Sequence, residues 1–167
     1  MQRSQDITAG ILTISDKGSR GLRKDESGDV IVRMLEEKGC LVAKRDVVPD
    51  ERDRISRLLA LWADTEGLRL IVTSGGTGLS PRDVTPQAME DIIDYPVPGM
   101  AEAMRAESLK KTPHAMISRA MVGVRSACLI INLPGSPRGA RENLAVLLPA
   151  LDHALEKLAG DPSDCAT

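Results

Sequence analysis

Three short segments of the chain combine small residues with hydroxyls and carboxylates, the residue types that hold phosphorylated ligands. They are Ser15-Asp16, residues 74–78 (SGGTG) and residues 132–136 (NLPGS). Glycines let the backbone approach a ligand closely, and backbone N–H groups at a helix start attract anions. Any one of these segments could be no more than a tight turn. Three of them at one edge of a sheet would predict a binding site.

The middle segment continues to residue 86 as SGGTGLSPRDVTP. It is not a Walker A loop, because no Gly-Lys-Ser/Thr follows the glycines, and its glycine spacing differs from the Rossmann fingerprint. It offers backbone donors, hydroxyls, the Arg82 guanidinium and the Asp83 carboxylate. These groups could hold a phosphorylated ligand beside a hydrated magnesium ion. A cap or turn role remains an alternative for Asp83.

Each of these segments follows a stretch that the hydrophobic pattern predicts to be a buried strand. Strands are predicted over residues 7–14, 40–48, 68–73 and 127–133, and amphipathic helices lie between and after them. This alternation predicts an α/β fold, a three-layer αβα sandwich with a mostly parallel central sheet. Sites in such folds lie beyond the carboxyl ends of the strands. We expect a single domain over residues 1–167, with its core at about residues 7–160.

Helix-start signals accompany two of the candidate site residues. Asp50 follows Pro49 at the start of a predicted helix, and Thr85 precedes Pro86 at the start of another. Aspartate and threonine are good N-caps, and a cap contributes about 1 kcal/mol. We therefore expect Thr85 to cap its helix, and capping is an alternative role for Asp50.

The composition excludes several classes of protein. There are 22 basic and 24 acidic side chains, a net charge of −2, and 42% of the residues are hydrophobic. This balance argues against disorder and against broad binding to nucleic acids or anionic membranes. Trp62 and Tyr95 are the only aromatic residues, which also argues against stacking nucleic-acid bases. The sequence has no apolar run long enough for a transmembrane helix and no apolar stretch typical of a secretory signal, so we expect a cytoplasmic protein.

Cysteines and histidines give little indication of a metal centre. Cys40, Cys128 and Cys165 include no C-x-x-C pair, and His114 and His153 lie far apart. Neither a disulfide framework nor a structural zinc site is expected from such a pattern. We expect buried or incidental thiols in a reducing compartment.

Residues 73–86 resemble the signature of the Mog-type molybdopterin adenylyltransferases of molybdenum cofactor biosynthesis, a family that includes the G domain of gephyrin. The similarity extends from about residue 7 to the final helix. A GGTG motif alone would be weak evidence, but several further blocks match the family in the same order. These blocks are Ile14-Ser15-Asp16, Val48-Pro49-Asp50-Glu51, Pro98-Gly99-Met100, Ile117-Ser118-Arg119, Gly123-Val124-Arg125 and residues 129–136 (LIINLPGS).

The resemblance implies adenylyl transfer. Members of this family bind molybdopterin, a pterin–dithiolene with a terminal phosphate, and activate it with Mg-ATP. The terminal phosphate attacks the α-phosphorus of ATP, pyrophosphate leaves, and adenylylated molybdopterin is formed. A separate insertion protein then loads molybdate. The resemblance further implies a homotrimer, or a hexamer as in the shorter related proteins, with Mg²⁺ as cofactor and ATP and molybdopterin as substrates.

The family's functional positions can be assigned to residues of this chain. Asp50 and Asp83 match the two acidic positions associated with catalysis, which implies that they organise Mg²⁺ and the reacting phosphates. For Arg82 a phosphate contact or a solvated side chain both remain open, and for Arg119 a ligand contact or a salt bridge. The residues assigned to molybdopterin or the nucleotide are Ser15, Asp16, Thr73, Ser74, Gly75, Gly76, Thr77, Gly78, Ser118, Arg119, Pro134, Gly135 and Ser136.

Two other functions are compatible with the sequence. The first is a noncatalytic molybdopterin-binding or scaffolding module of the same fold. The second is a general nucleotide hydrolase, which is disfavoured because the chain has no Walker lysine and no obvious base to activate water. The presence of both Asp50 and Asp83 favours an enzyme. With so few aromatic residues, a pterin and an adenine would have to be recognised by loop amides, hydroxyls, helix N-termini and aliphatic walls.

Overall fold

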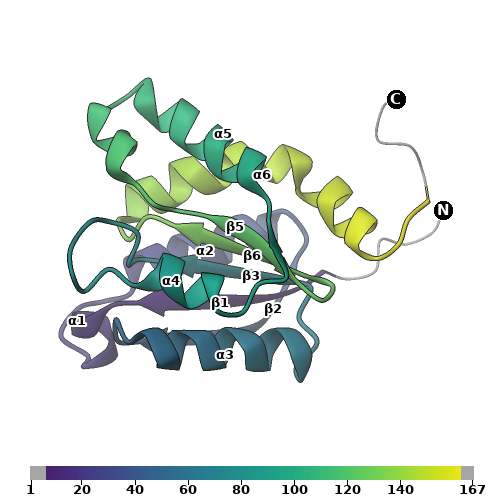
Figure 1. The fold of residues 1–167 in the computed structure, drawn as a ribbon, viewed down its shortest axis with the longest axis horizontal. Helices are drawn as coiled ribbons and strands as arrows, with labels where there is room; N and C mark the ends of the chain where they lie inside the picture. The colour runs from purple at the N-terminus through teal and green to yellow at the C-terminus, as the bar shows by residue number, and fades with distance from the viewer. Residues whose placement is uncertain (1–6, 163–167) are drawn as a thin grey trace.

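A central six-stranded sheet organises residues 7–162, the part of the chain that the computed structural model describes (Figure 1). The strand order is β2-β1-β3-β6-β5-β4. The first four strands in this order run parallel, whereas β5 pairs antiparallel with both β6 and β4. The expected mostly parallel α/β sheet is therefore confirmed. The strands are β1 (Thr8–Ile14), β2 (Leu41–Val48), β3 (Leu70–Ser74), β4 (Tyr95–Pro96), β5 (Val122–Arg125) and β6 (Cys128–Leu133).

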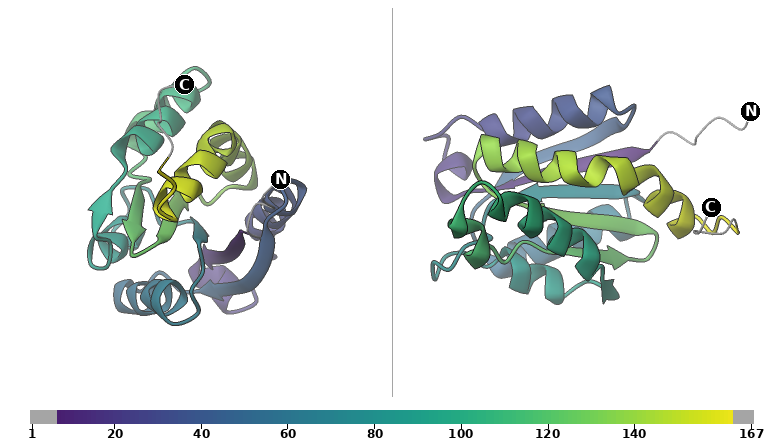
Figure 2. Two further views of the ribbon diagram at one scale, coloured as in Figure 1. Left: turned by 90° about the vertical axis from the view of Figure 1, so that its right-hand side faces the viewer. Right: turned by 90° about the horizontal axis from the view of Figure 1, so that it is seen from above.

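Helices cover both faces of the sheet and complete the three layers. α2, α6 and α5 lie side by side over one face, and α3 and α4 cover the other (Figure 2). No helix within residues 7–162 has both the length and the apolar character needed to cross a membrane. The helices are α1 (Asp16–Ser19), α2 (Glu26–Glu37), α3 (Arg52–Asp64), α4 (Thr85–Glu90), α5 (Pro98–Leu109), the 3-10 helix η1 (Pro113–Ile117) and α6 (Pro137–Leu158).

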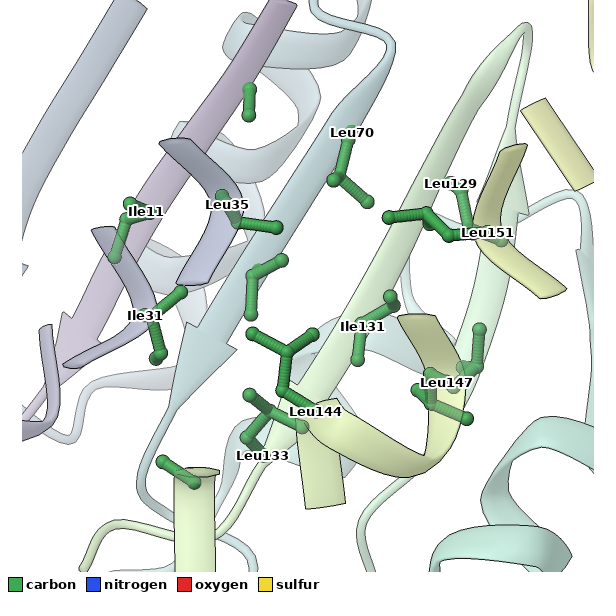
Figure 3. Packing of buried hydrophobic residues seen from close by; sticks show 14 of the residues in the cluster. Ile11, Ile31, Leu35, Leu70, Leu129, Ile131, Leu133, Leu144, Leu147 and Leu151 are labelled. Carbon is green, nitrogen blue, oxygen red and sulfur yellow. The ribbon is translucent and has the colours of Figure 1, made fainter. Parts of the chain in front are cut away.

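The core is aliphatic, as the composition requires. Every residue of β3 and β6 is buried, and their side chains alternate between the two faces. Leu70 and Ile131 pack beneath the leucines of α6 (Figure 3). On the other face of the sheet, Ile71 and Ile130 pack against α3 and α4. Burial on both faces explains why these strands appear in the sequence as continuous apolar runs.

Several boundaries differ from the sequence-based prediction. Strands β4 and β5 are not predicted, because two and four residues are too few to establish a period of two. β5 also contains Gly123, where a Cβ would lie 2.8 Å from Ile93 Cγ2, so a larger residue is excluded by close packing. Cys40 and Cys128 are buried and unpaired, as expected for structural thiols. Cys165 lies outside the described residues.

The sheet topology brings the three polar segments together. β1, β3 and β6 are neighbours, and their register pairs Thr13 with Ser74 and Ser74 with Leu133. Ser15, Gly75 and residues 134–136 therefore emerge side by side at the carboxyl edge of the sheet. The end of β2 lies next to the end of β1, which brings Asp50 to the same edge.

Candidate functional site

A cavity of about 640 Å³ lies at the carboxyl edge of the sheet. Its floor is formed where β1 and β3 end, and its walls come from the first turns of α2 and α6. Both candidate catalytic aspartates face this space. The predicted site residues that line it are Ser15, Asp50, Ser74, Gly75, Gly76, Asp83, Gly135 and Ser136.

The glycine loop after β3 passes close to the backbone of β1. Gly75 has φ +106°, and a Cβ on it would lie 2.2 Å from the carbonyl oxygen of Ile14. The Thr85 hydroxyl donates to the Gly75 carbonyl at 2.9 Å, and the Thr85 N–H donates to the Gly76 carbonyl at 3.2 Å. The prediction that Thr85 caps its helix is therefore wrong. The N-cap position of α4 is Val84, and Thr85 holds the glycine loop instead.

Asp50 makes reciprocal hydrogen bonds with Asp16 and does not cap α3. The Asp16 N–H donates to Asp50 Oδ2 at 3.0 Å, and the Asp50 N–H donates to Asp16 Oδ1 at 3.1 Å. The N-cap position of α3 is Glu51, without a side-chain cap. The capping alternative for Asp50 is therefore wrong. Asp50 Oδ1 faces the glycine loop, since it would lie 3.3 Å from a Cβ on Gly76.

Burial raises the pKa of the Asp50 carboxyl above its ordinary value. The hydrogen bond from the Asp16 N–H opposes this effect, and the negative charges of Asp16 and Asp83 reinforce it. Asp50 thus lies close to two other carboxylates, of which Asp83 lines the cavity and Asp16 does not. An ionised Asp50 would gain from a nearby cation.

Asp83 combines a turn with a position in the cavity. Its Oδ2 accepts a hydrogen bond from the Ser80 N–H at 3.0 Å and so stabilises a turn. The turn role that the sequence offered as an alternative for Asp83 is therefore present. Arg119 holds the same loop through backbone carbonyls rather than through a salt bridge. Its Nη2 donates to the Asp83 carbonyl at 2.6 Å, and its Nε donates to the Gly78 carbonyl at 2.9 Å. Arg119 does not line the main cavity.

The donor set at this edge fits a partly hydrated magnesium ion. Mg²⁺ usually keeps several waters and binds through one or two carboxylates together with substrate phosphates. Asp50 and Asp83 provide two carboxylates facing one cavity. Within residues 7–162, no group of three or more His, Cys, Asp or Glu side chains is arranged to hold a metal ion by itself. A magnesium ion bound here would therefore be completed by water and substrate oxygens.

Asp16 and Ser15 contribute to the site differently from the prediction. The Asp16 carboxylate forms a bidentate ion pair with Arg82, with distances of 2.7 Å and 3.0 Å, and does not line the cavity. The hydrogen bonds from Arg82 hold the pKa of the Asp16 carboxyl below its ordinary value. Ser15 lines the cavity, and its Oγ accepts from the Gly18 N–H at 3.0 Å as the N-cap of α1.

The remaining hydroxyls lie at different depths. Thr73 is fully buried and pairs with the side-chain amide of Asn132, so it lies below the cavity and does not line it. The Ser74 hydroxyl lies 3.0 Å from that of Ser27. Ser136 is the N-cap of α6, where its Oγ accepts from the Gly139 N–H at 3.0 Å. The start of this 22-residue helix thus faces the cavity.

A second cavity of about 340 Å³ adjoins the first and shares Ser136 with it. Arg105, Lys111 and His114 from α5 and the following segment contribute to its wall. The predicted site residues are therefore divided between two cavities. The first contains Asp50 and Asp83, and the second lies on the other side of Ser136, at the start of α6. The predicted residues that line the second cavity are Thr77, Gly78, Ser118, Pro134 and Ser136.

Sequence reasoning missed one wall of the larger cavity. Arg23, Lys24 and Ser27 line it, from the loop before α2 and the first turn of that helix. No motif marks them. The available signal is the run of glycines Gly18, Gly21 and Gly28 after the first strand, which indicates a backbone arranged for a turn or a ligand. Arg23 and Lys24 carry the positive charges of this cavity.

A glycine loop, a helix start and paired carboxylates at the strand ends give this α/β fold a site whose groups are suited to a phosphorylated ligand. Residues 10–153 match the model of a probable molybdopterin binding domain. A molybdopterin adenylyltransferase from Helicobacter pylori is 40% identical over 159 residues, which cover 94% of this chain and 90% of that protein. The chain therefore belongs to the family of probable molybdopterin-binding domains.

Two further comparisons agree with this membership. Gephyrin from Dictyostelium discoideum is 39% identical over 171 residues, covering 96% of this chain but only 24% of gephyrin. The molybdopterin biosynthesis enzyme MoaB from Thermus thermophilus has a TM-score of 0.88 at 52% identity, covering 95% of this chain and 99% of that chain. The expected family and the expected fold are confirmed.

Proposed function

We propose that the protein is an enzyme of molybdenum cofactor biosynthesis, a molybdopterin adenylyltransferase formed by a single molybdopterin-binding domain. It transfers AMP from Mg-ATP to the terminal phosphate of molybdopterin and releases pyrophosphate. One observation carries this proposal: Asp50 and Asp83 line the same cavity as the glycine loop and the start of α6. The 40% identity to a molybdopterin adenylyltransferase of similar length supports it.

The reaction requires two anions to be brought together, and the chain offers groups for this purpose. The backbone N–H of Gly76 and the N-terminus of α6 can bind phosphate oxygens, whereas the Gly75 N–H donates to the Leu133 carbonyl at 3.0 Å. Asp50 and Asp83 would hold Mg²⁺, which when bound supplies positive charge against the reacting phosphates. The protein orients the terminal phosphate of molybdopterin toward the α-phosphorus of ATP. Fixed orientation and a preorganised electrostatic environment then lower the barrier.

The two cavities suggest how the substrates are accommodated. The cavity that holds the aspartates is the reaction centre, where the triphosphate of ATP and the terminal phosphate of molybdopterin meet. The second cavity extends this space past Ser136. It would hold those parts of ATP and molybdopterin that lie outside the first cavity. Trp62 and Tyr95 line neither cavity, so binding rests on amides, hydroxyls and charge. Removing the phosphate from molybdopterin should weaken its binding far more than Tyr95→Ala does.

Arg23→Ala should raise the KM for ATP about fivefold, the effect of one exposed charge interaction. Arg23 is exposed at the cavity wall, and its side chain has no partner within residues 7–162, so it can attract a triphosphate. Initial-rate kinetics at low salt would measure the change, and salt should diminish it. Arg57→Ala is the matched control, because Arg57 is an exposed arginine on α3 outside the cavity. Equal effects of the two variants would contradict a role for Arg23.

We propose a homotrimer in the cytoplasm, with a hexamer as the alternative assembly, that passes its product to a molybdate-insertion protein. Large hydrophobic side chains remain exposed on β4 and η1, including Tyr95, Met116 and Ile117. Self-association would cover such side chains. Sedimentation equilibrium should give a mass of three or six chains. A monomeric mass at micromolar concentration would overturn this part of the proposal.

Incubation with molybdopterin, ATP and Mg²⁺ tests the activity. Adenylylated molybdopterin and pyrophosphate should appear in equal amounts. Pyrophosphate or phosphate without adenylylated pterin would instead indicate a nucleotide hydrolase. Binding of molybdopterin without turnover would indicate the noncatalytic module, the alternative that shares this fold.

A further inference from the structure

We propose that Asp16 is a positioning residue that fixes the positions of both candidate metal-binding residues, Asp50 and Asp83, without itself touching the substrates. The inference rests on the proposed adenylyl transfer for its kinetic consequences. Its structural basis is independent of that function. Asp16 is the first residue after the cap of α1, and its backbone and carboxylate bind two different segments of the site.

The first connection fixes Asp50. Two hydrogen bonds join Asp16 and Asp50 in opposite directions, at 3.0 Å and 3.1 Å, each from a backbone N–H to a carboxylate oxygen. This reciprocal pair binds the segment after β1 to the segment after β2. It uses Asp50 Oδ2 and leaves Oδ1 directed to the glycine loop. The orientation of the Asp50 carboxylate is therefore set by Asp16.

The second connection fixes the loop that carries Asp83. The Asp16 carboxylate accepts from Nε and Nη2 of Arg82, the residue directly before Asp83. Planar bidentate pairs of this kind restrict both distance and angle. Arg119 holds the other side of the same loop through the carbonyls of Gly78 and Asp83. The Asp83 segment is thus held from two sides, and Asp16 provides one of them.

The ion pair also keeps Arg82 out of the cavity. The side chain of Arg82 is 61% exposed and that of Asp16 is 27% exposed, so solvent screens their attraction. The contribution of the pair to overall stability is consequently small. Its value lies in geometry, because an error of about 1 Å in a catalytic group can cost about 10²-fold in rate.

Asp16→Asn and Arg82→Gln test this role, separately and together. Each should lower kcat about 10- to 100-fold and change the KM for ATP little, because alignment rather than substrate contact is lost. The double variant should be no worse than the worse single variant, since both changes break one connection. Arg82→Lys should recover part of kcat, because it restores the charge without the bidentate geometry.

Hydrogen–deuterium exchange provides a readout that does not depend on activity. Peptides that cover residues 78–84 should exchange faster in Asp16→Asn than in the wild type. Asp91→Asn is the matched control, because Asp91 also forms a bidentate pair with Arg52, at 2.6 Å and 2.7 Å, on the α3 side and away from the two cavities. Asp91→Asn should leave both kcat and the exchange of residues 78–84 unchanged.

Three outcomes would overturn the proposal. They are wild-type kcat in Asp16→Asn, a rise in KM alone, which would indicate a direct substrate contact, and unchanged exchange of residues 78–84. If the wild-type protein makes no adenylylated molybdopterin, the proposed function fails and the exchange experiment alone decides. Faster exchange in Asp16→Asn but not in Asp91→Asn then supports the positioning role, and equal exchange rejects it.

Discussion

Replacing Asp50 by asparagine should lower the rate of adenylyl transfer at least about 10²-fold while the protein remains folded. The asparagine side chain keeps an oxygen that can accept the Asp16 N–H, so the reciprocal hydrogen bonds can persist. It lacks the negative charge that a magnesium ion and its bound phosphates require. Steady-state assays with saturating ATP and molybdopterin would measure the loss. Unchanged turnover would reject Asp50 as a catalytic residue.

The same substitution should not destabilise the fold at neutral pH. Burial raises the pKa of Asp50, so its contribution to stability is fully present below the ordinary aspartate pKa of about 3.9 and is lost as pH rises through the raised value. An asparagine at this position does not titrate and has no such loss. The thermal midpoint of Asp50→Asn should therefore equal or exceed that of the wild type at pH 7, and any difference should shrink toward pH 4. Asp46→Asn, at an exposed carboxylate of β2, is the control for a general charge effect.

Gly75→Ala should both destabilise the protein and strongly lower its activity. A Cβ at this position would lie 2.2 Å from the backbone oxygen of Ile14, and φ is +106°, a conformation that residues with side chains rarely adopt. Strain and overpacking each cost about 1–3 kcal/mol, so we expect a loss of about 3 kcal/mol in the free energy of unfolding. Denaturant titration would measure it. The displaced loop should also lower kcat about 10²-fold in any folded fraction.

Two other glycines separate the causes of this effect. Gly67 has φ +63° with nothing within 4 Å of an added Cβ, so Gly67→Ala should cost only the backbone strain, about 1 kcal/mol. Gly99 has an ordinary φ and open space, so Gly99→Ala should be neutral or slightly stabilising. If Gly75→Ala proves no worse than Gly67→Ala, the close approach to β1 is unimportant.

Strands that are buried on both faces can be predicted from the sequence, whereas short or partly buried strands cannot. The continuous apolar runs of β1, β3 and β6 are visible because both faces of these strands are covered. Their adjacency follows from the parallel α/β pattern, so the meeting of Ser15, Gly75 and Ser136 at one edge is foreseeable. The short strands β4 and β5 depend on pairing within the sheet, β4 with β5 and β5 with β6, and leave no comparable pattern.

The errors at the site have a common physical cause. Asp50 and Thr85 are good local caps by residue type, yet each binds a backbone group from a distant segment instead. Local propensity is worth about 1 kcal/mol and is overridden when tertiary contacts offer a buried partner. The ion pair of Asp16 with Arg82 spans 66 residues and has no local signature. Such contacts become visible only once the sheet order is known.

The position of Trp62 makes the protein convenient to follow by fluorescence. Trp62 is the sole tryptophan, and its buried ring packs where a Cβ on Gly10 would lie, near the amino end of β1 and outside both cavities. Its emission should therefore change when the chain unfolds and stay constant when ligands bind. The emission of a bound pterin, with no tryptophan or tyrosine side chain lining the cavities to quench it, can report occupancy in the same sample. One spectrometer can thus separate loss of structure from loss of binding for every variant above.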